Sequence, residues 1–277
     1  MKRSPLLSGL LAGALFLTLA ACGPREDPEP SVSPSALPVP SPSVSPEAEP
    51  TPTPSPEATP APAAEPVWGE QSFDRTFTAG DGTTVLSVSY ALPLVQNTDA
   101  CPAGAAINSW YKAQGADLLS YAEDNYEMAV SDYEVSKASG FDFTPTAERM
   151  DYAVTYAGED YYSIRRSWTI TGSMPYSSQF CLSEQFDAAT GNKVGFADLF
   201  ADADGVRERV VAAFLAQEEI AAGGFTEAQI TAVYQPEHFY LSDGGYVFWI
   251  QGNDLPALHS PVEVTLSFDA LAGLRHG

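Results

Sequence analysis

Basic side chains are scarce in this chain of 277 residues, which carries 13 lysines and arginines against 36 aspartates and glutamates. The net charge of −23 argues against a nucleic-acid partner, because phosphate contacts need positive charge. Histidine is also rare, and His238, His259 and His276 lie in different predicted elements without the spacing of metal ligands. The sequence has neither a Gly-x-Ser-x-Gly elbow nor a phosphate-binding Gly-Lys-Ser/Thr loop. We therefore predict a chain that is not an enzyme and that needs no cofactor and no metal ion.

Long hydrophobic runs are confined to the first residues. Lys2 and Arg3 precede a nearly uninterrupted apolar stretch from Leu6 to Leu19. At about 14 residues, this stretch is shorter than the roughly 20 residues of a membrane-spanning helix. The pattern is typical of a cleaved signal peptide, here residues 1–21.

A cysteine directly follows the small residues that end this segment. Leu19-Ala20-Ala21-Cys22 resembles the bacterial lipobox, in which the cysteine is acylated and becomes the mature N-terminus. The alternative is an ordinary signal peptide that ends at Ala21, with Cys22 a bystander. Because two or more acyl chains hold a protein stably on a membrane, the lipobox predicts a lipid anchor at Cys22. The expected location is the extracytoplasmic face of the cell membrane.

Aromatic residues are absent from the segment that follows, which is rich in proline. Between residues 23 and 66, 15 of 44 positions are proline, and most of the others are Ser, Ala, Glu, Thr or Val. Such a composition cannot build a core, and proline removes backbone donors. We expect residues 22–66 to comprise the lipidated cysteine and a disordered stalk. As a spacer, the stalk would reach at most about 140 Å if fully extended.

Residues 67–277 are long enough for a substantial hydrophobic core. They hold 29 acidic against 10 basic side chains, which leaves a net charge of about −19. Such a charge attracts cationic partners, although it also serves solubility alone. Cys101 and Cys181 are the two cysteines of this part, and an even pair outside the cytoplasm favours a disulfide. Two buried thiols are the alternative.

Hairpins are predicted where two alternating stretches flank a turn, and helices where apolar residues recur at three- and four-residue spacing. The expected strands are residues 73–78, 84–92, 151–156, 161–171, 179–187, 238–242, 246–251 and 262–268. The expected helices begin near Pro102, at Asp202 or Asp204, and at a capping box of Thr226 and Gln229. This order predicts an α+β fold of antiparallel sheets with packed helices. We divide it into two interlocked subdomains, residues 67–175 and 176–277.

The C-terminal part resembles a known extracytoplasmic domain of unknown function. The segments that carry the resemblance are FDAATGNKVGFADLF (186–200), FYLSDGGYVFWIQ (239–251) and PVEVTLSFDAL (261–271). This domain is shared by RsiV-type anti-sigma factors, which sense lysozyme, and by the non-catalytic N-terminal part of PdaC-type peptidoglycan deacetylases. The upstream part, with YYSIRRSWTIT (161–171), resembles the companion subdomain that precedes it. The resemblance implies an α+β fold and a role in binding or sensing.

This sequence departs from the family in two ways, and each limits which family properties can be expected of this chain. Family members often have Gly-Gly-Ala-His at a stretch where this chain has Thr171-Gly172-Ser173-Met174-Pro175, without histidine. The chain also has neither the cytoplasmic part of an anti-sigma factor nor a deacetylase domain. We therefore expect a lipid-anchored binding or sensing module for a basic secreted protein of the lysozyme type. The alternative is an accessory module that binds peptidoglycan.

Two acidic segments have simpler alternatives to a functional site. Asp198, Asp202 and Asp204 resemble a calcium loop, but positions one and twelve of that loop would be apolar, so helix capping explains them better. Residues 121–127 mix tyrosines with acids, a composition that suits contact with sugars or basic proteins as well as a solvated helix face.

Overall fold

The structure, a computed structural model, describes residues 64–172, 177–256 and 258–276, all within the unit of residues 59–277. The predicted signal peptide, Cys22 and nearly all of the predicted stalk lie outside these residues, as does most of the stretch 171–175. Among the helices of the described residues, none is both long and apolar enough to cross a membrane.

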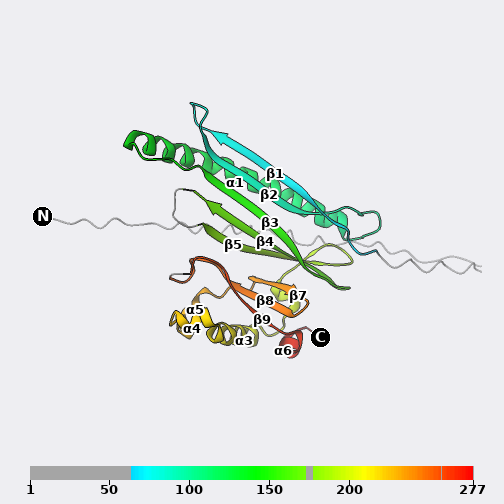
Figure 1. Cartoon of the computed structure of the whole chain (residues 1–277). Coiled ribbons are helices and arrows are strands. Elements are labelled where there is room, and N and C mark those ends of the chain that lie inside the picture. The colour runs from blue at the N-terminus through cyan, green and yellow to red at the C-terminus, as the bar shows by residue number, and fades with distance from the viewer. Residues whose placement is uncertain (1–63, 173–176, 257, 277) are drawn as a thin grey trace, which may run out of the picture. The chain divides into compact units, whose positions relative to one another are not determined.

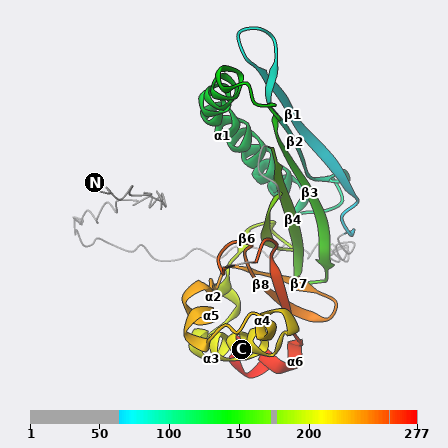
Figure 2. The ribbon, with the colours of Figure 1, turned by 60° about the vertical axis from the view of Figure 1, so that its left-hand side comes forward.

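Six strands form the larger sheet in the order β1-β2-β3-β4-β5-β6. Figure 1 labels β1 to β5, and Figure 2 labels β6. They are β1 (Trp68–Thr78), β2 (Thr84–Val95), β3 (Thr146–Ala157), β4 (Tyr161–Thr171), β5 (Ser178–Asp187) and β6 (Lys193–Val194). The hairpins β1–β2 and β3–β4 and the pair β4–β5 are antiparallel, as predicted. β2 and β3, however, pair in parallel, so the sheet is mixed. A parallel pair needs a long crossover, which α1 (Gly104–Ser139) supplies.

Helix α1, of 36 residues, runs along one face of the larger sheet (Figure 1). Successive side chains of a strand point to opposite faces of a sheet, and Tyr90, Ile164 and Phe186 point toward the helix. There they form the first core with Ile107 and Tyr111 of α1. The predicted helix therefore exists, but it extends well beyond the apolar repeat that indicated it.

Two glycines fit α1 to its surroundings. A Cβ atom on Gly115 would lie 2.3 Å from the ring of Phe73 on β1, so glycine lets the helix approach the sheet closely. Gly140 has a φ of 69°, the left-handed conformation that commonly follows the last turn of a helix.

The smaller sheet is antiparallel, in the order β7-β8-β9. Its strands are β7 (Phe239–Ser242), β8 (Gly245–Ile250) and β9 (Val262–Leu266). The remaining helices are α2 (Phe196–Leu199), α3 (Ala203–Ala216), α4 (Glu218–Ala222), α5 (Glu227–Val233), α6 (Phe268–Leu271) and the 3₁₀ turn Ala272–Leu274. In Figure 2, α3 to α6 lie on the far side of the smaller sheet from α1. The prediction of an α+β fold with packed helices is confirmed.

The two sheets face each other through β7, which contacts β3, β4 and β5. The apolar contact is small and includes Trp249 of β8 and Cys181 of β5. Polar contacts surround it: Arg165 Nε donates to Glu263 Oε1 at 2.9 Å, and Tyr240 Oη donates to Glu263 Oε2 at 3.0 Å. The two cores are thus joined by a partly polar interface, and each core has helices on its outer side.

The chain passes from the first core to the second between Ala188 and Phe196. The residues of β5 and β6 were expected in a C-terminal subdomain of residues 176–277. In the structure both strands extend the larger sheet beyond β4. The boundary predicted at residue 175 falls between β4 and β5, which are hydrogen-bonded neighbours in one sheet.

Cys101 and Cys181 are free thiols in the structure, so the predicted disulfide is not formed. The reason lies in strand alternation. Cys101 belongs to the core beneath α1, whereas Cys181 points to the opposite face of the larger sheet, toward Tyr240 and Trp249. Burial raises the pKa of Cys181 to about 12, which keeps its thiol protonated. The alternative of two buried thiols matches the structure.

Candidate functional site

Polar contacts fix α1 to the larger sheet at both ends. Near its start, Asn108 Oδ1 accepts from the Val95 N–H at 2.7 Å, and Asn108 Nδ2 donates to the Val95 carbonyl at 2.8 Å. Near its end, Lys137 Nζ and Tyr133 Oη both donate to the Asp81 carboxylate, at 2.7 and 2.6 Å. The hydrogen bond from Lys137 is the main cause that lowers the pKa of Asp81. The helix is therefore held along its length in one position on the sheet.

One stripe of α1 combines acidic, aromatic and apolar side chains. Asp117, Tyr121, Asn125, Met128 and Asp132 are three or four residues apart, so they lie on one side of the helix. Tyr121 and Met128 are exposed to 48% and 62%, which is unusual for side chains of this size. We call these five residues the acidic stripe.

The acidic stripe borders two adjoining cavities between α1 and the larger sheet. The smaller cavity has a volume of about 180 Å³; Tyr121, Met128 and Asp132 form its exposed rim, and the buried Leu86 and Glu148 line its depth. The larger has a volume of about 370 Å³. Its lining is Gln114, Asp117, Leu118, Tyr121 and Trp168. Tyr121 lines both cavities.

Glu148 of β3 is a buried carboxylate without a cationic partner. The side chain is 5% exposed, and Oε2 accepts a hydrogen bond from Tyr90 Oη at 2.7 Å. Among the ion pairs of the described residues, none includes Glu148. Burial raises the pKa of Glu148, and the side chains of Tyr90 and Trp168 oppose this shift. An ionised carboxylate in such a place is unfavourable unless a cation joins it.

A second buried glutamate on the same face of the sheet has its cation. Glu184 of β5 is 4% exposed and forms an ion pair with Arg166, whose Nε donates to Oε2 at 3.1 Å. Tyr111 Oη donates to the same oxygen at 3.0 Å. The Arg166 guanidinium also lies over the rings of Trp110 and Tyr111, at 5.7 and 5.9 Å from their centroids. This arrangement satisfies a buried charge within the protein.

Trp168 of β4 lines the larger cavity. Its ring meets Tyr121 edge-on, with centroids 5.9 Å apart, and lies 5.6 Å from the ring of Phe180. Its indole Nε1 is buried beside the Glu148 carboxylate, close enough to lower the pKa of Glu148, but it forms no hydrogen bond of normal geometry. A buried indole N–H and a buried carboxylate, joined at most by a poorly aligned contact, therefore lie together beneath the acidic stripe.

Basic side chains do not neutralise the acidic stripe. Six of the ten basic residues of the folded part form ion pairs within the described chain. On or beside α1, Arg75 pairs with Glu123, and Lys137 pairs with Asp81. No ion pair of the described residues includes Asp117 or Asp132. The stripe thus presents uncompensated negative charge beside exposed apolar surface.

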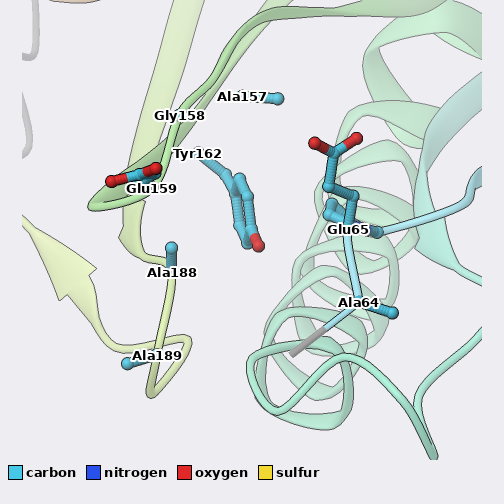
Figure 3. A pocket seen from close by; sticks show the side chains of 9 residues that line it. Ala64, Glu65, Ala157, Gly158, Glu159, Tyr162, Ala188 and Ala189 are labelled. Atoms are coloured by element: carbon cyan, nitrogen blue, oxygen red, sulfur yellow. The ribbon is translucent and has the colours of Figure 1, made fainter. Parts of the chain in front are cut away.

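Another cavity, of about 490 Å³, lies where the described chain begins (Figure 3). In Figure 3 the ring of Tyr162 stands between Glu65 and the turn that carries Ala188 and Ala189. Glu65 and Glu159 are exposed, so water can solvate their carboxylates. None of the residues that line it has a buried polar atom without a hydrogen-bond partner. We therefore regard the acidic stripe with its two cavities as the stronger candidate site.

Two of the three acidic residues that resembled a calcium loop, Asp198 and Asp202, cap helices as expected, and Asp204 forms an exposed ion pair with Arg207. Asp202 Oδ1 accepts from the Gly205 N–H at 2.9 Å at the start of α3, and Asp198 Oδ2 accepts from the Gly195 N–H at 2.8 Å. Among the described residues, no group of three or more His, Cys, Asp or Glu side chains is placed to hold a metal ion.

The three histidines lie in separate places. His238 stacks on Trp249 with ring centroids 5.1 Å apart, and burial lowers its pKa. His276 Nε2 lies 3.1 Å from the Ala197 carbonyl. His259 Nδ1 lies 3.4 Å from Asn253 Oδ1. Of the sequence-based candidates, only the segment 121–127 contributes to the candidate site. Glu148 and Trp168 were missed, because nothing in a strand sequence shows that a charged residue will be buried without a partner.

Comparisons with known proteins identify the fold. No family model matches the sequence, and no curated protein matches it. A solved member of the DUF3298 family from Bacteroides fragilis superposes with a TM-score of 0.58 at 12% identity, covering 78% of this chain and 95% of that one. A DUF3298 protein from Pseudomonas aeruginosa superposes with a TM-score of 0.51 at 10% identity, covering 77% and 96%. The chain therefore has the fold of DUF3298 proteins, a family named only as a domain of unknown function.

Proposed function

We propose that this chain is a lipid-anchored binding or sensing module at the extracytoplasmic face of the cell membrane. Its ligand is a basic secreted protein, such as a cell-wall hydrolase of the lysozyme type. The observation that carries the proposal is the acidic stripe of α1. There Asp117 and Asp132 form no ion pair in the described chain, and Tyr121 and Met128 are exposed beside them.

The composition of the stripe supports a protein ligand. Aromatic residues and methionine are enriched where proteins meet, and complementary charge raises the rate of association. The charge of about −19 on residues 67–277 attracts a cationic protein from a distance before any contact forms. The resemblance of residues 186–271 to the lysozyme-sensing RsiV-type domain makes lysozyme the first ligand to test.

The test measures association of lysozyme with the purified full chain, in detergent micelles, at low and high salt. The variant Asp117→Lys/Asp132→Lys reverses both acids of the stripe. We expect its association rate constant to fall about tenfold, because charges at the edge of an interface act mainly on this rate. We also expect binding to weaken as salt rises, since salt screens exposed charges beyond about 10 Å.

The matched control is Glu208→Lys/Glu219→Lys, which changes the net charge equally at exposed positions of α3 and α4. Its association rate should stay within twofold of the wild type. Equal losses in both variants would mean that the stripe is not the binding surface. An absence of binding to any basic secreted protein at low salt would overturn the proposed function.

The larger cavity also supports the alternative of a peptidoglycan-binding module. Tyr121 and Trp168 offer ring surface, and Gln114 and Asp117 offer polar groups beside it, a combination that suits a sugar. Sedimentation of the full chain with purified peptidoglycan tests this function. The chain should appear in the pellet, and the variant Trp168→Ala should remain in the supernatant. Recovery of the wild type in the supernatant would rule the alternative out.

A further inference from the structure

We propose that the smaller cavity beneath α1 receives a single lysine or arginine side chain of the protein ligand, with Glu148 as its counter-charge. This inference rests on the proposed function and specifies how the acidic stripe recognises its ligand. It assigns Glu148, Trp168 and Tyr121 to a cation subsite.

The size of the cavity fits one side chain. Pockets for drug-sized ligands have volumes of roughly 300 to 1,000 Å³, whereas this cavity has about 180 Å³. Leu86, Met128 and Ile170 line it with apolar surface. Lysine and arginine carry such an apolar stem below a charged head, so the stem can pack against these residues while the head reaches a carboxylate.

The buried groups at the cavity define the charge of the occupant. Glu148 is 5% exposed, and its neutral neighbours, the Tyr90 hydroxyl and the Trp168 indole N–H, bring no positive charge to it. The exposed Asp132 adds a second carboxylate at the rim. The ring of Tyr121, also at the rim, can contact a cation through its face. These groups together favour a cation and disfavour an anion.

The same fold shows how such a subsite is built. At Glu184, a buried carboxylate accepts from the Tyr111 hydroxyl, and a guanidinium lies against it and over aromatic rings. At Glu148, the carboxylate accepts from the Tyr90 hydroxyl, and the rings of Tyr121 and Trp168 lie nearby. Both sites thus have a buried carboxylate, a tyrosine hydroxyl that donates to it and aromatic rings nearby, but only the Glu184 site has a guanidinium. No basic residue of the described chain forms an ion pair with Glu148. A basic side chain of another protein would complete the arrangement.

The test uses butylguanidinium as the probe and butylurea, its neutral analogue, as the control ligand. Each is added to the ¹⁵N-labelled full chain, and the indole N–H signal of Trp168 is followed by nuclear magnetic resonance. The loss of that signal in Trp168→Phe assigns it. We expect butylguanidinium to shift the signal saturably and butylurea to leave it in place.

Variants then locate the site. Glu148→Gln keeps an acceptor for Tyr90 but removes the charge, so the affinity for butylguanidinium should fall at least about tenfold. Asn125→Phe, which fills the cavity without changing Glu148, should also abolish the shift. The control Asp124→Asn removes an exposed charge of α1 outside the cavity and should bind as the wild type does. The other indole signals report whether each variant is folded.

The outcomes separate this inference from the proposed function. No shift in the wild type, or an equal shift in Glu148→Gln, would overturn the inference. Equal affinity of lysozyme for the wild type and Glu148→Gln would also overturn it, while the proposed function stands. Binding of butylguanidinium without binding of any basic protein would support the cation subsite and overturn the proposed function.

Discussion

At the scale of single residues, two buried glutamates differ in how their negative charge is compensated. Glu184 and Glu148 are both buried on the face of the larger sheet that α1 covers. Glu184 is neutralised by Arg166, whereas Glu148 has a tyrosine hydroxyl and a raised pKa. Because Glu148 has no cation, the unliganded protein is less stable than it would be with this buried charge paired. Groups with such shifted pKa values are common at binding sites.

We predict that Glu148→Gln becomes more stable relative to the wild type as the pH rises from 4 to 7. A carboxyl group whose pKa is raised on folding contributes stability at pH values below its ordinary pKa, and this contribution is lost as the pH rises through the folded pKa. Glutamine accepts from Tyr90 without carrying charge, so its contribution does not change with pH. Urea unfolding of both proteins at pH 4 and pH 7 measures the difference.

The matched variant Glu184→Gln should have the opposite effect. It leaves the buried Arg166 without its anion, which costs about 3 kcal/mol or more in comparable buried pairs. The free energy of unfolding at pH 7 should therefore fall for Glu184→Gln while it rises for Glu148→Gln. The same sign for both variants would contradict the assignment of charges in this core.

The two buried cysteines give a direct chemical prediction. Cys101 and Cys181 are 0% and 1% exposed, and the raised pKa of Cys181 keeps its thiol protonated. In the native protein neither should react with a thiol reagent within minutes at pH 8, and both should react after unfolding without a reductant. Titration of thiols with Ellman's reagent, in a Cys22→Ser background, counts them. If the unfolded chain shows no thiol, a disulfide is present after all.

The predicted disulfide and the overlooked burial of Glu148 have one cause, because both depend on contacts that are distant in the chain. A cysteine pair outside the cytoplasm favours a disulfide, but the pairing needs both side chains on the same side of the sheet. β5 is buried on both faces, so its sequence does not show that Cys181 points away from α1. Glu148 was missed for a similar reason, since its burial depends on α1, which is distant in the chain.

At the scale of elements, turns and caps were the reliable signals. The turn at Asp243-Gly244 and the capping box of Thr226 and Gln229 predicted a hairpin and a helix that the structure contains. The second half of α1 lacked such a signal, because Ala129 is its only buried residue after Ala122. Contacts distant in sequence, such as the one between Lys137 and Asp81, hold that half in place. These contacts cannot be read from local patterns.

A prediction at this scale concerns the start of α3. Asp202→Ala removes the oxygen that accepts from the Gly205 N–H, and loss of such a cap costs about 1 kcal/mol. The control Asp204→Ala, which affects an exposed ion pair with Arg207, should cost much less. Thermal unfolding compares the variants. Added calcium should not change the melting temperature of the wild type. A rise in the melting temperature would support a calcium-binding loop at these residues.

At the scale of the whole molecule, the proposed function depends on where the folded part is held. We propose that Cys22 is acylated and that residues 23–66 separate the domain from the membrane. The charge of about −19 then faces the outside of the cell, where basic secreted proteins are present. This arrangement is predicted from the sequence, and its N-terminal residues lie outside the described part.

The lipid anchor can be tested with one substitution. The native host expressing the wild type should incorporate radioactive palmitate into the chain and retain it in the membrane fraction. Cys22→Ser should not be labelled and should be recovered in the culture medium, because the acyl chains are its only strong attachment. Membrane retention of an unlabelled Cys22→Ser chain would contradict the anchor.

The parallel pairing of β2 and β3 has a consequence for how the molecule folds. It joins Leu86 to Thr146, 60 positions along the chain, whereas β1–β2 and β3–β4 close over short turns. Closing a long loop is entropically unfavourable until other contacts compensate for it, so local pairings tend to precede distant ones. We expect the two hairpins to form early and independently. The rate at which the two hairpins join into one sheet then depends on the docking of α1. This helix connects β2 to β3, so its docking brings these two strands side by side.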